Sequence, residues 1–244
     1  MFSRAKITDD LGKIGVAKGD VLMLHASLKA IGPVAGRADG LLDALQDAVG
    51  RNGTLMMVLG AANNGAVFDA LTTPADPDVG TLAEILRTRA GAKVSNHPEG
   101  RFAALGPHAK TLLASQPWDD YFGPNSPLDA LTKLSGKVLR LGADPDTTTL
   151  THLAEYLTPL AGKRRVTRQV LVQGPHGPEQ KSVNSLDDEE GIFDNQGEDY
   201  FASILKAFSA DGHGQTGTIG HARSRLLNAR SFTTFAAGWM TNHL

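Results

Sequence analysis

Residues Lys137–Tyr156 read KVLRLGADPDTTTLTHLAEY, and this stretch predicts the class of fold. Its apolar run, Val138–Leu141, has the length and branching of a buried strand. The Gly, Asp and Pro residues that follow end the strand. Asp146–Thr149 then predicts a helix start, because Asp and Thr side chains accept hydrogen bonds from the unpaired N–H groups there. Leu and Ala recur beyond it at helical spacing, so the stretch predicts a strand, a tight turn and a helix.

His152 and Glu155 stand three residues apart in this helix, on the same face as Thr149. A His and a Glu near the positive end of a helix are suited to acid–base chemistry. The alternative is a capped helix whose His and Glu pair in solvent. The pattern by itself leaves both interpretations open.

An upstream segment predicts a parallel sheet. Val21–Leu24 and Thr54–Leu59 have the composition of strands, and Leu residues between them repeat as a helix that ends at Gly50. Strand, helix and strand at this spacing indicate a βαβ unit. The segment His25–Val34 then falls beyond the carboxyl end of a strand, where ligands bind in such sheets. Its Gly, Ser and Lys residues could hold a phosphate-rich ligand, although an ordinary connecting loop has a similar composition.

The remaining pattern predicts a single domain over residues 1–244, without internal repeats or a clear boundary. A loop is expected over Ala61–Val79 and a capping box at Thr81 and Glu84. Further expected elements are a helix ending at Gly15, helices over Pro107–Ser115, Tyr200–Phe208, His221–Asn228 and Phe232–Met240, and a strand over Val166–Val172 that turns at His176-Gly177.

A cluster of carboxylates follows the predicted strand. Between Asp187 and Asp199 the chain carries seven Asp and Glu residues, and no Lys or Arg appears until Lys206. Such a run is usually a solvated loop. It could also attract a polycationic ligand, because clustered carboxylates concentrate positive charge.

Composition excludes several classes of protein. The 244 residues are 41% hydrophobic and 20% charged, with a net charge of −2, which gives no case for nucleic-acid binding. No apolar run approaches a membrane span or a signal peptide, so we expect a cytoplasmic protein. Without Cys there is no disulfide, no thiolate metal site and no covalent Cys intermediate. The segment Gly212–Gly217 matches GxGxxG but follows a predicted helix, so we interpret it as a surface turn.

Several blocks of sequence, in order and over most of the chain, resemble the aminoglycoside 3-N-acetyltransferases of the antibiotic N-acetyltransferase family, which is unrelated to the GNAT-type enzymes. The blocks are GDVLMLHASLKAIGPV (Gly19–Val34), HPEGRFAALG (His97–Gly106), FGPNSPL (Phe122–Leu128), LGADPDTTTLTHLAE (Leu141–Glu155) and the acidic segment Asp187–Tyr200. The resemblance implies an α/β protein, a three-layer α/β/α fold with a mixed, partly parallel sheet. It also implies a smaller added lobe, which we place within residues 160–215.

The resemblance further implies a cytoplasmic enzyme that transfers acetyl from acetyl-CoA to the 3-amino group of a 2-deoxystreptamine aminoglycoside, giving antibiotic resistance. An amine attacks a thioester only when unprotonated, and a His suits the role of base near neutral pH. We assign this role to His152. Glu155 would orient it or hold substrate ammonium groups, while Asp146 and Thr149 would set the helix end and the tautomer. The carboxylate that pairs with His152 stays open, and the lack of Cys favours direct transfer in a ternary complex.

The predicted binding residues form two sets, and no metal ligand is expected because no second His follows His152 at helical spacing. Acetyl-CoA is assigned to His25, Ser27, Leu28, Lys29, Ile31, Gly32, Pro33, Val34, His97 and Phe102. The aminoglycoside is assigned to Asp69, Asp187, Asp188, Glu189, Glu190 and Glu198.

Two departures from the family pattern suggest other functions. The loop Gly60–Asp78 is shorter than in many relatives, and Arg101 stands where they often carry a small polar residue. Both features could narrow the choice of substrate or indicate an acetyltransferase for a different amine. A non-catalytic binder of cationic ligands is the alternative from another class. The protein is expected to be a monomer or a homodimer.

Overall fold

The computed structural model describes residues 1–60, 66–187 and 199–244. The helices are α1 (Arg4–Lys13), α2 (Leu28–Ile31), α3 (Arg37–Val49), η1 (Pro77–Val79), α4 (Thr81–Thr88), α5 (Ala109–Leu112), α6 (Pro127–Lys133), α7 (Leu150–Tyr156), α8 (Tyr200–Ala210) and α9 (Ala229–His243). The strands are β1 (Val21–Ala26), β2 (Thr54–Val58), β3 (Lys93–Val94), β4 (Phe102–Leu105), β5 (Lys137–Leu141), β6 (Arg165–Gly174), β7 (Gly177–Leu186), β8 (Gln215–Ile219) and β9 (Ala222–Asn228).

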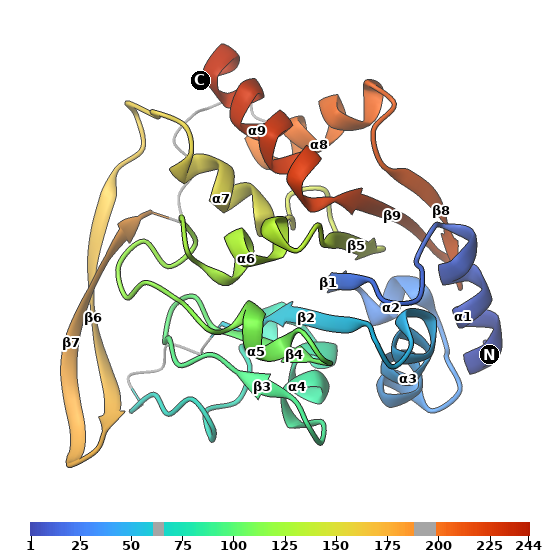
Figure 1. Cartoon of the computed structure of the whole chain (residues 1–244), viewed down its shortest axis with the longest axis horizontal. Coiled ribbons are helices and arrows are strands. Elements are labelled where there is room, and N and C mark those ends of the chain that lie inside the picture. The colour runs from blue at the N-terminus through green and yellow to red at the C-terminus, as the bar shows by residue number, and fades with distance from the viewer. Residues whose placement is uncertain (61–65, 188–198) are drawn as a thin grey trace.

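A mixed sheet of seven strands, in the order β3-β4-β2-β1-β5-β9-β8, forms the centre of the molecule (Figure 1). Strands β2, β1 and β5 run parallel. Strand β4 pairs antiparallel to β2 and β9 pairs antiparallel to β5, while β3 and β8 pair antiparallel to β4 and β9. The predicted βαβ unit is therefore confirmed, with α3 as its main helix. Because β1, β2 and β5 point the same way, their carboxyl ends meet at one edge of the sheet.

The sheet separates two hydrophobic clusters. Successive residues of a strand point to opposite faces, and in β1 Met23 packs in one cluster while Leu22 and Leu24 pack in the other. Helices α5–α9 contribute to the first cluster and α1–α4 to the second. The predicted three-layer α/β/α fold with a mixed sheet is confirmed.

Strands β6 and β7 form a separate two-stranded antiparallel sheet. This hairpin stands on the far side of the molecule from β8 (Figure 1). The indole N–H of Trp118 donates to the carbonyl of Ser182 at 2.6 Å, and Phe68 forms a bridge with Val172. The predicted strand and turn are confirmed. The hairpin lies within the range predicted for the smaller lobe, whose separate role stays a prediction.

The helix predicted over His221–Asn228 is wrong, because these residues form β9 between β5 and β8. Their sequence alternates, with Ala222 and Ser224 buried and Arg223 exposed. A period of two residues is the signature of a strand. The residues Gly212–Gly217 include a turn, as predicted, but β8 begins within them at Gln215.

Two local signals near helix starts were also misinterpreted. Helix α4 begins at Thr81 with Gly80 as its N-cap, so no capping box forms, and Glu84 instead pairs with Arg87 at 2.6 Å. Helix α6 was missed although Ser126 caps it, accepting a hydrogen bond from the Asp129 N–H. Within the described residues, no helix has the length and hydropathy to cross a membrane.

Candidate active site

A cavity of about 470 Å³ opens at the carboxyl ends of the parallel strands. The segment after β1 lines it with His25 to Lys29, and the segment after β5 lines it with Gly142–Asp144, Thr147 and Thr149. These two segments are far apart in the chain, and both were singled out from the sequence. The structure therefore brings the predicted coenzyme segment and the predicted helix start to one cavity.

His25 is the most deeply buried ionisable residue of this cavity, with 5% of its surface exposed. Burial, and then the positive charge of Arg140, lower the pKa of His25 to about 3. The ring is therefore neutral near pH 7. Its Nε2 atom is buried without a hydrogen-bond partner, so it can form a hydrogen bond with a ligand without adding a charge.

Helix α7 carries a hydrogen-bonded chain of ionisable groups. The Nδ1 atom of His152 lies 2.8 Å from Oε2 of Glu155. The other oxygen of Glu155 accepts from Nζ of Lys163 at 2.9 Å and from the hydroxyl of Tyr200. The side chains of Glu155 and Lys163 are only 1% and 2% exposed. Both oxygens of the carboxylate are therefore engaged, and Glu155 has no surface left for substrate ammonium groups.

The electrostatics keep this carboxylate ionised. Burial raises the pKa of Glu155, but the hydrogen bond and charge of His152, followed by Lys163, outweigh burial and lower it. The pKa of Tyr200 is raised, first by burial and then by the charge of Glu155. Tyr200 is consequently a neutral donor, and Glu155 is a charged acceptor for the Nδ1 proton of His152.

Two aromatic rings hold the imidazole of His152. Phe122 stacks on it, with ring centroids 5.0 Å apart and planes 10° apart, and Phe201 contacts it edge-on at 4.9 Å. The side chain of His152 remains 15% exposed. Since Glu155 takes Nδ1, the Nε2 atom is the one available to a substrate. A carboxylate that orients a His in this way makes it a competent general base.

Asp146 and Thr149 were predicted to set the helix end and the tautomer, and the geometry matches the first of these roles only at Thr149. Thr149 is the N-cap of α7, but its side chain makes no capping hydrogen bond. Asp146 is exposed, and its carboxylate accepts from the Thr147 hydroxyl at 3.2 Å. The contact with Glu155 orders the ring of His152 instead, because it is the carboxylate within hydrogen-bond distance.

Several predicted coenzyme residues lie in the interior. His97 is 1% exposed, accepts the Gly100 N–H at 2.9 Å through Nδ1 and lies 2.8 Å from the Trp118 carbonyl through Nε2. Phe102 and Ile31 are fully buried, and Val34 is 6% exposed. The side chains of these four residues are therefore already occupied by contacts within the protein, and their assignment to the coenzyme stays a prediction. Gly32 and Pro33 do not line the cavity.

The acidic residues predicted to bind the antibiotic lie in different environments. Asp187 is 2% exposed and pairs with Arg164 at 2.6 Å and Arg168 at 3.4 Å, so its charge is already compensated inside the protein. Asp69 accepts from the Leu71 and Thr72 N–H groups in a turn. The positions Asp188, Glu189, Glu190 and Glu198 lie outside the described residues.

Arg101 points into the protein interior. It is fully buried, and it donates to the carbonyls of Ala70 at 2.6 Å and Pro74 at 3.1 Å. Burial, followed by the charge of Arg87, lowers its pKa to about 10. The residue fastens the segment before α4, and an influence on the choice of substrate stays a prediction.

Sequence reasoning missed Lys163, Tyr200, Phe122 and Phe201 as parts of this site. Each contacts His152 or Glu155 across the tertiary structure, and no local spacing marks such contacts. A tyrosine and a phenylalanine at the first two positions of a predicted helix were the available signal. Among the described residues, no three His, Asp or Glu residues are grouped so as to hold a metal ion.

Comparison with known proteins assigns the chain to a family. A family model described as aminoglycoside 3-N-acetyltransferase matches residues 23–241. The chain belongs to this family. The N(3)-acetyltransferase VII of Streptomyces paromomycinus is 37% identical over 269 residues, covering 99% of this chain and 92% of that relative. The N(3)-acetyltransferase IX of Micromonospora chalcea is 39% identical over 264 residues, covering 98% and 93%.

Solved structures of aminoglycoside acetyltransferases share the fold. AAC(3)-Xa superposes with a TM-score of 0.95 at 38% identity, covering 99% of this chain and 93% of that one. AAC-IIIb in a binary complex with CoASH gives 0.94 at 34% identity, covering 98% and 96%. A histidine-to-alanine mutant of AAC(3)-IVa in complex with a gentamicin gives 0.87 at 28%, covering 99% and 89%. The predicted family and enzyme class, an aminoglycoside N(3)-acetyltransferase, are confirmed.

Proposed function

We propose that the protein transfers acetyl from acetyl-CoA to the 3-amino group of a 2-deoxystreptamine aminoglycoside, with His152 as general base. The observation that carries the proposal is the chain from His152 through Glu155 to Lys163 and Tyr200. Membership in the aminoglycoside 3-N-acetyltransferase family, and the CoASH complex of a relative, support acetyl-CoA as the co-substrate. Cytoplasmic location and the oligomeric state stay predictions.

The proposed chemistry begins with the 3-amino group as a free amine, after its ammonium form has released one proton to water. Nε2 of His152 accepts the second proton as the nitrogen attacks the thioester carbonyl. The anionic Glu155 stabilises the resulting imidazolium, and Lys163 and Tyr200 keep Glu155 ionised and fixed. Collapse of the tetrahedral intermediate expels the coenzyme thiolate, which takes up the proton held by His152 and becomes the free thiol, so that His152 returns to its neutral form. A base of this kind contributes roughly 10²–10⁴-fold to the rate.

The cavity beyond β1 and β5 is our candidate for the acetyl-bearing arm of the coenzyme. Thr149 lines it and lies one helical turn before His152, so a thioester in this cavity approaches the base from the N-terminal end of α7. The neutral His25 and the hydroxyl of Ser27 are polar groups available in its lining.

The test is thiol release from acetyl-CoA with gentamicin, kanamycin, neomycin or apramycin present. We expect turnover with at least one of these antibiotics and an acetyl group on its 3-amino nitrogen by mass spectrometry and NMR. Turnover only with unrelated amines would move the substrate outside the aminoglycosides. Tight antibiotic binding without any thiol release would instead favour a non-catalytic binder.

A further inference from the structure

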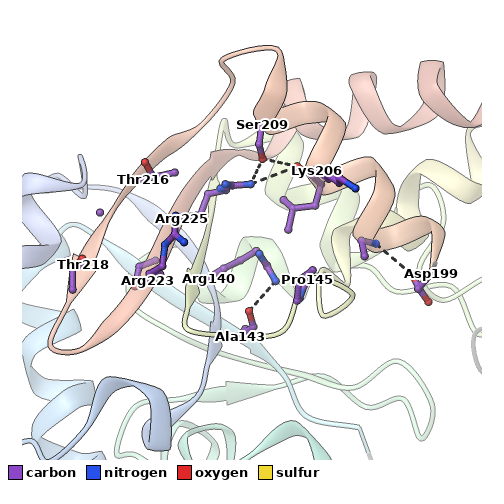
Figure 2. Close-up of a pocket in the computed structure, with 14 residues that line it drawn as sticks. Arg140, Ala143, Pro145, Asp199, Lys206, Ser209, Thr216, Thr218, Arg223 and Arg225 are labelled. Carbon is purple, nitrogen blue, oxygen red and sulfur yellow. Dashed lines mark hydrogen bonds between the residues drawn. The ribbon is translucent and has the colours of Figure 1, made fainter. Parts of the chain in front are cut away.

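A second and larger cavity lies apart from His152. It measures about 840 Å³ and lies between α8 and the strands β5, β9 and β8 (Figure 2). Four cationic side chains line it, namely Arg140 from β5, Arg223 and Arg225 from β9, and Lys206 from α8. Asp199 is the single carboxylate in the described lining, and it already caps α8 by accepting the Phe201 N–H at 2.6 Å.

The arginine side chains of this cavity lie close to one another. Arg140 and Arg225 are directly opposite each other in the antiparallel β5–β9 pair, an arrangement that is destabilising for like charges. Burial, followed by the charge of Arg225, lowers the pKa of Arg140 to about 10, although Asp146 and Asp144 act against this. Burial and then Arg223 lower the pKa of Arg225. Among residues 1–60, 66–187 and 199–244, no carboxylate forms an ion pair with any of these arginines.

The cavity is also rich in hydrogen-bond donors. Arg140 is 6% exposed, donates through Nη2 to the Ala143 carbonyl at 3.1 Å, and has a buried Nε–H without a partner. Arg225 donates to the hydroxyl of Ser209. Thr216 and Thr218 line the same cavity from β8 (Figure 2). Several fixed guanidinium groups with hydroxyls beside them match the oxygens of phosphate groups.

The three arginines form no ion pair with a described carboxylate, and like charges of this kind disfavour a polycationic antibiotic. The sheet register instead links this cavity to the one beside β1. His25 is paired with Arg140, Arg140 with Arg225, and Arg225 with Thr216, so these residues form one polar row across three strand pairs. Both cavities also include Ala143 in their lining.

We propose that this basic cavity binds a phosphorylated small molecule through its phosphate groups. Two sources supply such a ligand, the phosphorylated nucleotide end of acetyl-CoA and a free nucleotide or polyphosphate. The first source rests on the proposed function, since the acetyl end would then lie in the adjoining cavity.

The binding test uses isothermal titration with pyrophosphate and with adenosine 3′,5′-bisphosphate. Arg223 is exposed and suits a charge reversal that leaves the core intact. We expect Arg223→Glu to raise the Kd of the bisphosphate about tenfold or more, and Arg223→Gln to raise it less. The matched control Arg51→Gln, in the exposed turn after α3, leaves the Kd unchanged. Absence of saturable binding, or binding that charge reversal does not weaken, overturns the proposal.

Competition distinguishes the two sources. If acetyl-CoA displaces the bisphosphate, and Arg223→Glu raises the KM for acetyl-CoA but not for the phosphate-free donor S-acetyl-N-acetylcysteamine, the site binds the coenzyme. If acetyl-CoA and the bisphosphate bind together, the site takes a separate phosphorylated ligand. These binding measurements need no turnover. A failure of acetyl transfer would therefore contradict the proposed function, while the titration would still show whether the cavity binds phosphate groups.

Discussion

At the residue scale, the imidazole of His152 is held on three sides. Phe122 and Phe201 pack against its ring, and Glu155 takes its Nδ1 atom at 2.8 Å. A ring fixed in this way presents Nε2 in one orientation, so binding of a substrate does not have to order it. The geometry favours proton transfer at a single atom, which makes the residue a sharp target for mutation.

Replacing His152 by Ala is expected to lower kcat by about 10²–10⁴-fold, because the amine then has to lose its proton to water. Thiol release from acetyl-CoA measures the effect. His176→Ala is the matched control, since His176 lies exposed in the β6–β7 turn. The Kd of acetyl-CoA should change little in His152→Ala. Unimpaired turnover in this variant would remove His152 from the mechanism.

Variants of Glu155 and Lys163 can separate the effect of this buried ion pair on stability from the effect of the Glu155 carboxylate on catalysis. Glu155→Gln leaves Lys163 buried without its counter-charge, which is expected to cost about 3–5 kcal/mol of unfolding free energy. The double variant Glu155→Gln/Lys163→Met buries no charged side chain at these two positions, so it should regain most of the unfolding free energy that Glu155→Gln loses. Activity should stay low in both, because His152 lacks its carboxylate. Urea unfolding and thiol release measure the two effects, and a fully active double variant would contradict the assignment.

The lowered pKa of Glu155 also means that the protein loses stability as the pH falls. The carboxylate has its ordinary pKa near 4.5 in the unfolded chain and a lower one in the fold. Its stabilising contribution is therefore complete above that value and is lost as the pH falls through the folded pKa.

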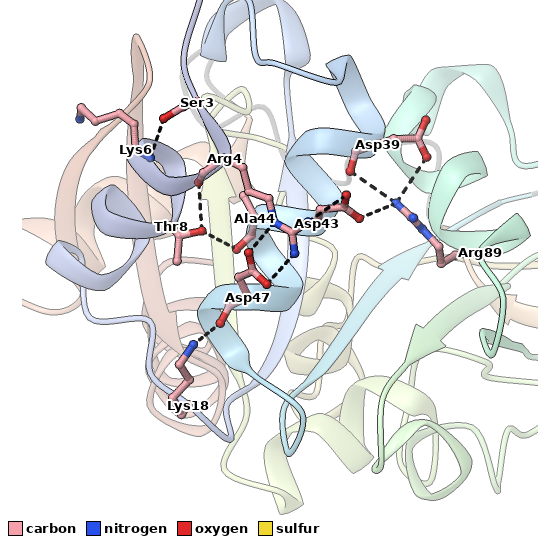
Figure 3. Close-up of polar contacts among 10 residues, drawn as sticks. All are labelled: Ser3, Arg4, Lys6, Thr8, Lys18, Asp39, Asp43, Ala44, Asp47 and Arg89. Carbon is pink, nitrogen blue, oxygen red and sulfur yellow. Dashed lines mark hydrogen bonds and ion pairs between the residues drawn. The ribbon is translucent and has the colours of Figure 1, made fainter.

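At the scale of elements, buried apolar contacts hold helix α1 to α3 more firmly than the ion pairs on its surface. Figure 3 shows Arg4 against Asp47 and Asp43 of α3, and Arg89 reaching Asp43 and Asp39. These pairs are solvent-exposed, with 48% of the Arg4 side chain accessible, and exposed pairs contribute little. The buried side of α1 places Ile7 and Leu11 in the core at 0% exposure.

Leu11→Ala is accordingly expected to lower the free energy of unfolding by about 2–5 kcal/mol, because it leaves a cavity between α1 and α3. Asp47→Ala should have a much smaller effect that high salt reduces further. Urea denaturation of the two variants at low and high salt checks the contrast. Equal losses in both variants would show that the ion pairs dominate.

The segment before α4 depends on one buried side chain. Arg101→Met keeps most of the side-chain volume but leaves the carbonyls of Ala70 and Pro74 without their donor. We expect a loss of about 1–3 kcal/mol in unfolding free energy and faster amide exchange across residues 66–79. Arg51→Met serves as the exposed control. The relative kcat/KM values for different antibiotics should stay the same, whereas a changed ranking would show a role for Arg101 in specificity.

At the scale of the whole molecule, two buried neutral histidines make stability depend on pH. His25 and His97 are 5% and 1% exposed, and burial lowers their pKa values to about 3 and about 4. The unfolded chain binds protons at these positions below about pH 6.5, while the folded protein does not until the pH is far lower. The unfolded state is therefore favoured as the pH falls through this window.

We expect the free energy of unfolding to fall by about 1 kcal/mol per pH unit for each of these histidines between about pH 6 and pH 4. Urea titrations at several pH values measure the slope. His97→Gln should reduce it, since one proton-binding site disappears from the unfolded chain. Identical slopes in the variant and the unaltered protein would mean that other groups control the acid response.

The sequence by itself determined the features that are local or periodic. The β1–α3–β2 unit and the strand–turn–helix around Leu141–Thr149 were predictable, because residue spacing reports which face of an element is buried. His152 and Glu155 were also found, since a separation of three residues places two side chains on one helical face. The alternation in Ala222–Asn228 carried the correct signal for β9, although it was interpreted as a helix.

Only the tertiary structure decided which side chains are free to act. Lys163 and Tyr200 meet Glu155, and Arg101 and Asp187 turn inward, because packing brings together segments that no sequence spacing relates. The row from His25 through Arg140 to Arg225 exists only because three strands pair in one register. Hydrogen bonds and charges depend on distances in space, and those distances are set when the two faces of the sheet are covered.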